Sequence, residues 1–295
     1  MKRRFPAQRF TTIMASTALL FVSVAPISAL AADPFRTGTT ARPIDSDTEA
    51  AFTAVFQRGN YPEARQYVQK ALKSDPKEPM VYALAAGVAF LDNDWTAMST
   101  YADQTVKVAE KLMPTDPLRG NLYQGVGNFL QAAYSISEGG GGTAIGTPQA
   151  LLKVQQSLDF IEKAKAVDAK DPELSLLQGF LDWVIASNLG LFDPKQAIDR
   201  LQNYAAPNYL SYRGIALAYR DMNQPDQALV AVDEALKAAP DNPELIYLKA
   251  QILNIQGKKA ESLQLFDQVV TKLDQLPPPF AKEITDERNR VAANQ

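Results

Sequence analysis

The chain has 295 residues, of which 46% are apolar and 21% are charged, and its formal net charge is −3. This balance is typical of a globular protein, and the absence of basic blocks argues against binding of nucleic acid or docking on anionic lipid headgroups. There is no Cys and no His, which excludes disulfides, thiolate and imidazole chemistry, and zinc sites built on either residue.

Residues 1–31 have the pattern of a signal peptide. Four basic residues and no acid open the segment, an apolar stretch over 13–30 follows, and Ala29-Leu30-Ala31 has the small-x-small form of a signal-peptidase site. An uncleaved membrane anchor is the alternative, which Pro26 disfavours. We therefore expect export to the periplasm of a bacterium, with a thylakoid lumen or the extracellular space as alternatives.

The next segment, residues 32–44, is polar. It contains Pro34, Gly38 and Pro43, and it predicts a flexible leader before the first helix near Asp45.

Helical pairs are expected from Asp45 onward. A turn at Gly59-Asn60-Tyr61 divides the first pair, and a turn at Asp92-Asn93-Asp94 divides the second. Boundaries of similar form end in Pro79, Pro172 and Pro243. Proline suits the first turn of a helix because its missing N–H has no partner to lose there.

The third pair departs from this spacing. One helix is expected over Leu118–Ser137 and its partner over Pro148–Val167, with a Gly-rich insertion over 138–147 between them. Gly141 and Gly146 have the spacing of a phosphate-binding loop, but Thr147 and Pro148 stand where Lys and Ser or Thr are required, and no strand precedes them. We interpret the segment as a solvated insertion, or as one that becomes ordered on a partner.

The pattern is clearest near the C-terminus. Pro172–Ser187 and Pro194–Tyr204 predict a degenerate fourth pair, and Tyr209–Asn242 is a complete unit whose spacings recur 34 residues further on. A polar helix over residues 279–295 is expected to cap the end.

These spacings resemble those of the tetratricopeptide repeat (TPR) family, in which aromatic, Leu-Gly, Tyr, Ala and Pro positions recur over 34 residues. The resemblance covers residues 45–276 and implies an all-α fold, a right-handed superhelix of about six stacked helical hairpins over residues 45–278. The first helix of each pair is then expected to form the concave face. Small residues would lie where helices pack closely, at Ala64, Ala86, Ala216, Ala228, Ala235 and Ala250.

Two candidate binding sites are identified on first helices. Side-chain amides recur at helical spacing at Asn121, Gln124, Asn128 and Gln131. We expect this row to face the concave groove, where amides can bond a peptide backbone or a glycan, with a solvated stripe as the alternative. A cationic-aromatic patch suited to a carboxylate is predicted from Arg213, Arg220, Tyr247 and Gln251, with pairing to Asp221, Asp226 or Glu244 as the alternative.

Phe180 and Trp183, with Trp95, are assigned to packing rather than to the groove. The Lys and Asn residues with which some TPR proteins clamp a C-terminal carboxylate are not found.

The resemblance implies a non-catalytic scaffold or adaptor in the cell envelope that binds a protein or an extended peptide. No cofactor, metal or nucleic acid is expected, and no stable membrane insertion after signal cleavage. The alternative is a periplasmic helical protein that binds a small ligand or a glycan, or processes a glycan with two facing acids. Self-association is possible but has no support in the sequence.

Overall fold

The computed structural model describes residues 33–189 and 193–293, so the signal-peptide prediction lies outside the described residues. Within them the chain is helical, without a strand. The α-helices are α1 Ser46–Thr53, α2 Tyr61–Ser74, α3 Pro79–Leu91, α4 Trp95–Leu112, α5 Pro117–Ile136, α6 Gly142–Val167, α7 Pro172–Leu189, α8 Pro194–Asn203, α9 Asn208–Asp221, α10 Pro225–Ala238, α11 Pro243–Ile255, α12 Lys259–Val270 and α13 Pro278–Ala293.

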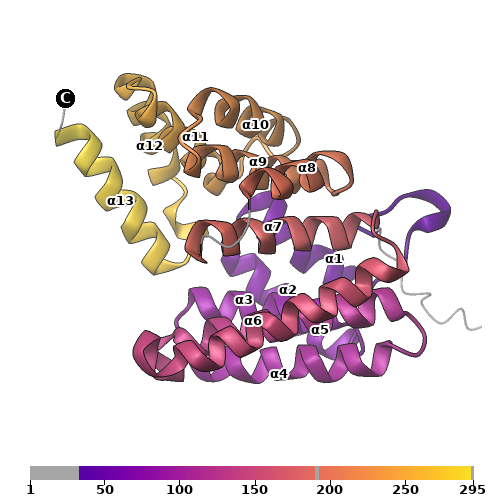
Figure 1. Cartoon of the computed structure of the whole chain (residues 1–295). Coiled ribbons are helices and arrows are strands. Elements are labelled where there is room, and N and C mark those ends of the chain that lie inside the picture. Colours follow the sequence, from indigo (N-terminus) through magenta and orange to yellow (C-terminus); the bar gives the residue numbers. More distant parts are fainter. Residues whose placement is uncertain (1–32, 190–192, 294–295) are drawn as a thin grey trace, which may run out of the picture.

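Consecutive helices pair as antiparallel hairpins, from α1/α2 to α11/α12, and each hairpin packs on the next (Figure 1). Helix α1 continues as a π-helical segment, Ala54–Arg58, and α13 packs on α12 at the C-terminal end. The predicted all-α stack of hairpins is confirmed.

Helix starts follow the sequence signals. Pro79, Pro172 and Pro243 are the first residues of α3, α7 and α11, as predicted. Carboxylates cap other starts: Asp94 Oδ1 accepts from Ala97 N at 3.0 Å at the start of α4. Each cap satisfies backbone N–H groups that the helix itself leaves unpaired.

Small residues lie where helices approach most closely. The six alanines that the repeat spacing placed in such positions are all completely buried: Ala64, Ala86, Ala216, Ala228, Ala235 and Ala250. A longer side chain at any of them would overpack a core that has no room for it.

The Gly-rich segment 138–147 is a tight connection in place of the expected long insertion. A 3-10 turn covers Glu138–Gly140, and α6 begins at Gly142, before the Pro148 that was expected to open it. A Cβ atom on Gly146 would lie 1.6 Å from Ser135 O, so only glycine lets the start of α6 approach the end of α5 this closely. Glycine here serves backbone packing.

The stack bends until its first hairpin meets the fifth and sixth. Asn242, completely buried before α11, donates from Nδ2 to Phe56 O at 3.0 Å and to Gln57 O at 3.2 Å. Gly59 turns the chain here with φ +61°, and a Cβ atom on it would lie 2.9 Å from Pro243 Cδ. We call this set of contacts the ring closure.

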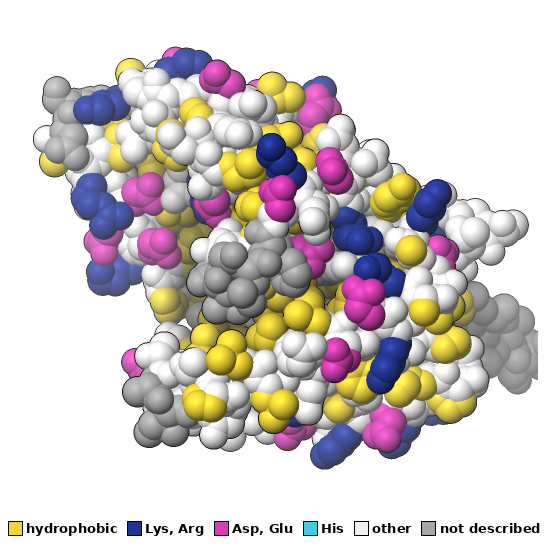
Figure 2. Space-filling model, in the orientation of Figure 1, with side chains coloured by type: hydrophobic (Ala, Val, Ile, Leu, Met, Phe, Trp, Pro, Cys, Tyr) yellow, Lys and Arg dark blue, Asp and Glu magenta, His cyan; other side chains and the backbone are white. Residues whose placement is uncertain are grey.

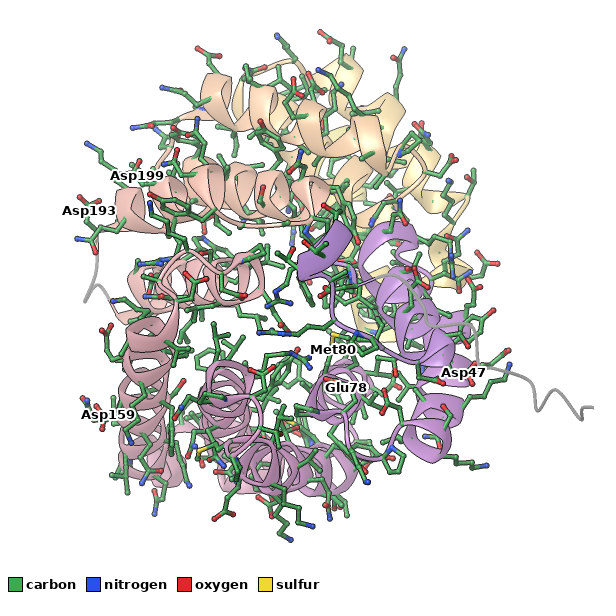
Figure 3. All side chains as sticks on the ribbon, turned by 90° about the vertical axis from the view of Figure 1, so that its right-hand side faces the viewer. Asp47, Glu78, Met80, Asp159, Asp193 and Asp199 are labelled. Atoms are coloured by element: carbon green, nitrogen blue, oxygen red, sulfur yellow. The ribbon has the colours of Figure 1, made fainter. Side chains whose placement is uncertain are left out.

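The ring closure leaves the hairpins arranged around a central space. Viewed from the side of Figure 1, the helices surround this space, with Glu78 and Met80 near it and Asp159 and Asp193 at the outer rim (Figure 3). First helices therefore face one another across the middle of the molecule.

The leader, residues 33–44, lies folded against the hairpins, in contrast to the flexible segment expected from its composition. Asp33 Oδ1 accepts from Phe35 N at 2.8 Å and forms a turn that buries both residues. The Phe35 ring packs edge-on against Phe52, with 5.2 Å between ring centroids. The leader therefore closes one side of the central space.

Candidate binding cavity

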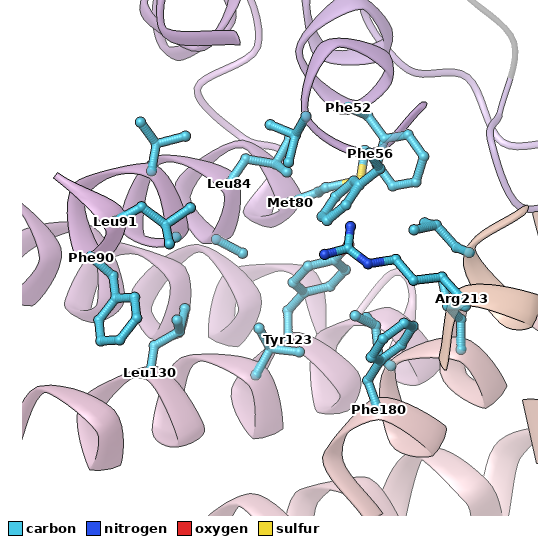
Figure 4. A pocket seen from close by; sticks show the side chains of 18 of the residues that line it. Phe52, Phe56, Met80, Leu84, Phe90, Leu91, Tyr123, Leu130, Phe180 and Arg213 are labelled. Atoms are coloured by element: carbon cyan, nitrogen blue, oxygen red, sulfur yellow. The ribbon is translucent and has the colours of Figure 1, made fainter. Parts of the chain in front are cut away.

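A cavity of about 570 Å³ occupies the middle of the ring and is the main candidate site. We call it the central cavity (Figure 4). Its walls come mainly from α1 with its π-helical continuation, α3, α5, α7 and α9, the first helices of five hairpins, together with Phe35 of the leader and Tyr61 at the start of α2. Principal wall residues are Phe52, Phe56, Met80, Leu84, Tyr123, Phe180, Trp183 and Arg213.

The polar tips of the aromatic wall residues are already bonded to the protein. Tyr123 Oη donates to Glu173 Oε1 at 2.7 Å, Tyr61 Oη donates to Glu244 Oε1 at 2.9 Å, and Trp183 Nε1 donates to Asp221 Oδ2 at 3.0 Å. Burial, together with the neighbouring carboxylate, raises the pKa of both tyrosines, so both hydroxyls keep their protons. These side chains present apolar surface to the cavity.

Arg213 is the one charged side chain among the described residues that line the central cavity. Its guanidinium projects into the cavity toward Tyr123 (Figure 4). Glu244 Oε2 accepts from its Nη2, and the same carboxylate binds Tyr61. Burial opposes the charge on Arg213, but Glu244 outweighs it and the pKa of Arg213 is raised. The cavity wall therefore carries one guanidinium, which is paired with Glu244, and is otherwise apolar.

A second cavity of about 510 Å³, the side cavity, adjoins the first and lies among α3 to α7. Gly87, Phe90 and Leu130 line both cavities, so the two apolar cavities adjoin one another along these residues. Exposed apolar side chains stand at its edge, including Ile136 and Leu151. Figure 2 shows hydrophobic side chains gathered in the hollow between the lower helices and those above them.

Gly87 has an unusual position in this wall. It lies inside α3, and a Cβ atom built on it would meet no other atom within 4 Å. Most other helical glycines have close neighbours, such as Gly127, whose Cβ would lie 2.6 Å from Val106 Cγ2. A Cβ atom at position 87 would therefore lie in open space beside the cavity.

A buried ionic cluster lies beside the leader. Glu173 on α7 is completely buried and accepts from Arg119 Nε at 2.9 Å and from Arg36 Nη2 at 2.9 Å. Arg119 also binds Glu78 through two hydrogen bonds of 2.9 and 2.7 Å, and Arg36 binds Asp171. Burial would raise the pKa of Glu173, but Arg119 and Arg36 lower it to about 2. The cluster fastens the leader to the starts of α3, α5 and α7.

This arrangement bears on the alternative of glycan processing, which requires two acids facing one another. Glu78 and Glu173 are brought together, but through Arg119, which lies between them. Neither acid is among the described residues that line the cavities. A carboxyl with a low pKa and bonded to arginine is a poor general acid.

The amide row on α5 lies beside the cavity and does not line it. Gln124 and Asn128 are buried; Gln124 Nε2 donates to Val106 O of α4 at 2.8 Å, and Lys153 of α6 donates to Asn128 Oδ1 at 3.3 Å. Gln131 bonds Asp103 of α4, and Asn121 bonds Pro117 O. The expected orientation toward the groove is thus corrected, because Tyr123, Val126 and Leu130 take the concave face and the amides lie roughly 150° around the helix from them.

Three of the four residues of the predicted cationic patch, Arg220, Tyr247 and Gln251, lie together and are bonded within the chain. Arg220 Nη1 donates to Gln251 Oε1 at 2.8 Å, and Gln251 Nε2 donates to Glu287 Oε2 of α13 at 2.9 Å. Tyr247 donates to the same carboxylate. Arg213 lies apart from them, in the cavity wall with Glu244. Arg213 pairs with Glu244 and Arg220 pairs with Asp221, as the alternative of pairing within the chain predicted.

Sequence reasoning missed the aromatic wall. Phe180 and Trp183 pack against the core as predicted, and the same two side chains also line the central cavity. The sequence feature that indicates this wall is that the first helices also carry apolar residues on the face opposite their buried alanines. Leu84 on α3 is an example. A helix with apolar residues on both faces contacts something on both.

Across residues 33–189 and 193–293, no group of three or more acidic side chains is placed to hold a metal ion. No helix in this part of the chain combines the length and apolarity that crossing a bilayer requires.

Comparison with known proteins supports the repeat assignment. The tetratricopeptide repeat family model matches residues 50–97 and 213–277, which include most of the first two hairpins and of the α9–α12 segment. A search of curated proteins found no match.

Three solved structures are similar at low identity. A thermophilic TPR protein of Thermus thermophilus is 14% identical, with 84% of this chain and 100% of that chain covered and a TM-score of 0.32. The APC/C hetero-tetramer Cut9-Hcn1 is 16% identical, with 81% and 54% covered and a TM-score of 0.38. The TPR2AB domain of yeast Sti1, in a complex with pHSP90, is 15% identical, with 83% and 97% covered and a TM-score of 0.36.

Proposed function

We propose that this chain is a non-catalytic binding scaffold of the bacterial cell envelope, and that an apolar part of its partner enters the central cavity. Tetratricopeptide repeats support a role as an interaction scaffold in general, because stacked hairpins present a preformed concave surface. The observation that carries the proposal is the cavity, whose walls come from five first helices and are almost entirely apolar.

Two kinds of partner suit such a cavity. A partner protein that inserts apolar side chains is favoured by the general use of this type of repeat. A small ligand is favoured by size, because ligand pockets are typically about 300–1,000 Å³ and mostly apolar. The central cavity, about 570 Å³ and lined by one charged residue, has both properties.

The location rests on the sequence alone. The basic start, the apolar stretch and the Ala29-Leu30-Ala31 site support cleaved export. Fractionation of cells that express the full chain tests this, with N-terminal sequencing of the product. We expect a soluble periplasmic protein that begins at Ala32, and a membrane-bound or cytoplasmic full-length chain would refute the location.

The binding site is tested by filling it. In the Gly87→Phe variant the new ring has open space on the cavity side of α3. Val230→Phe, at an exposed position on α10, is the matched control. Crosslinked envelope extracts would be searched for captured proteins, and native mass spectrometry would detect retained small ligands. The proposal predicts that Gly87→Phe removes the bound species and Val230→Phe retains it; equal binding by both variants would contradict the cavity as the site.

A further inference from the structure

We infer that the occupant of the central cavity is the hydrocarbon chain of an anionic single-chain amphiphile, a fatty acid or its close equivalent, with its carboxylate at Arg213. The inference rests on the proposed function only in taking the cavity as the binding site. It then selects one occupant by size, by hydrogen bonding and by charge.

Size argues against a partner helix. An α-helix with its side chains is about 10–12 Å wide and rises about 5.4 Å per turn, so one turn fills roughly 400–600 Å³. The central cavity, at about 570 Å³, would therefore enclose about one turn, and together with the side cavity of about 510 Å³ it would enclose roughly two. Isolated helices need about 12–15 residues even for marginal stability. Only a fragment of such a helix would be enclosed.

Hydrogen bonding argues against an extended peptide. Every residue of an extended segment brings an N–H and a C=O group that must find partners when buried. In this wall Tyr61, Tyr123 and Trp183 already donate hydrogen bonds to carboxylates of the protein. A hydrocarbon chain brings no polar group along its length, so it loses nothing on entering such a space.

The shape of the space suits a linear chain. The central and side cavities share Gly87, Phe90 and Leu130, so they adjoin one another along these residues. The second cavity adds about 510 Å³ of equally apolar space beyond the first. A flexible chain can pass from one into the other, whereas a rigid helix or a compact ring system would occupy one of them.

The charge of Arg213 sets the direction in which the hydrocarbon chain of the ligand lies. Arg213 is the one charged residue among the described residues that line the central cavity, and its guanidinium projects inward (Figure 4). Glu244 engages Nη2, and a guanidinium has five N–H donors, so it can bond a second carboxylate as well. The head of the ligand is therefore anionic and its tail extends away from Arg213 toward Gly87.

The test is a titration of delipidated protein with octanoate, decanoate, dodecanoate, tetradecanoate and hexadecanoate, followed by calorimetry. Each buried methylene should raise affinity about fourfold until the space is full, after which affinity levels off. Hexadecanol should bind at least about tenfold more weakly than hexadecanoate, and the Arg213→Met variant should lose that difference.

Cavity variants make the test specific. Gly87→Phe should lower the affinity for hexadecanoate at least about tenfold and the affinity for octanoate much less, because the new ring would lie where the two cavities adjoin. Val230→Phe should change neither affinity. Phe180→Ala removes a ring from the wall and should shift the levelling point to longer chains, which keeps the inference testable if Gly87→Phe does not fold.

The outcomes separate the inference from the proposed function. Affinity that is independent of chain length, or unchanged by both cavity variants, overturns the acyl-chain inference. If fatty acids do not bind but a captured protein is lost in Gly87→Phe, the inference fails and the scaffold proposal stands. If neither ligand nor partner depends on position 87, both fail.

Discussion

Substitution of Asn242 by Ala should open the ring closure and destabilise the protein more than the loss of a helix cap elsewhere. Asn242 is completely buried and performs two tasks. Its Oδ1 accepts from Glu244 N at 2.9 Å and caps α11, while its Nδ2 bonds the carbonyls of Phe56 and Gln57, which belong to the first hairpin.

The magnitude follows from these bonds. Loss of an N-cap costs about 1 kcal/mol. Two backbone carbonyls left without a donor cost about 1–3 kcal/mol each when they stay buried. Because the first hairpin can partly separate and admit water, we expect a total of about 2–4 kcal/mol. The Asn242→Asp variant keeps the cap and loses the donor, so it isolates the closure.

Urea unfolding followed by circular dichroism gives the free energies, with Asp94→Ala as the control. Asp94 caps α4 through one bond to Ala97 N, far from the closure in the sequence, and its loss should cost about 1 kcal/mol. Amide hydrogen exchange should rise in residues 54–60 of the Asn242 variants alone. If Asn242→Ala costs no more than Asp94→Ala, or if that segment stays protected, the ring closure does not contribute as described.

Three further predictions concern single side chains. Glu173 has a pKa lowered to about 2 from 4.5, so its contribution of about 3 kcal/mol to the free energy of unfolding is complete above pH 4.5 and is lost as the pH falls toward 2. Glu173→Gln should cost about 3–5 kcal/mol at neutral pH, and the fall of its urea midpoint at acid pH should be shallower than that of the unmodified protein. Asp182 has a pKa raised by burial to about 6 from 3.8, so the folded state loses about 1–2 kcal/mol of stability, after solvent screening, as the pH rises through that interval. Asp182→Asn should be more stable than the unmodified protein above pH 6, and its stability should not fall between pH 3.8 and 6; an unchanged pH dependence would contradict the assignment. Gly87→Ala should stabilise the protein by about 0.5–1 kcal/mol, because alanine favours the helix and its methyl group meets no other atom. Gly127→Ala should destabilise the protein, because its methyl group would clash with Val106. Thermal melts that reverse this order would refute the packing described.

The hairpins could be predicted because their signals are local. Alanines at fixed spacing, such as Ala228 and Ala235, and prolines at helix starts, such as Pro243, encode contacts between neighbouring helices. Those contacts depend on residues near in sequence, and the 34-residue period repeats them. The helix boundaries at Pro79 and Pro172 were correct for the same reason.

The ring closure could not be predicted because it depends on how small rotations accumulate over several hairpins. Nothing in the sequence near Asn242 shows that its side chain meets Phe56, 186 residues away. The leader is a similar case. Its polar composition predicted flexibility, but Arg36 binds the buried carboxylates of Asp171 and Glu173, which only the folded ring brings together.

The candidate site was predicted in part. Periodicity placed the concave face on the first helices, and Arg213 does line the cavity. The amides of α5 were expected in the groove, but Gln124, which directly follows the wall residue Tyr123 in the sequence, bonds α4 instead. A rotation of about 100° per residue separates a wall residue from one packed on the next helix.

The most direct test of the central claim is photo-crosslinking in living cells. A photoreactive phenylalanine analogue at Phe180 lies in the wall of the central cavity, and the same analogue at Val230 lies exposed on α10. Mass spectrometry of the irradiated protein would then weigh any adduct. We predict a discrete adduct at position 180 that is absent at position 230 and is lost in the Gly87→Phe background. No adduct at position 180, or equal adducts at both positions, would contradict the cavity as the binding site.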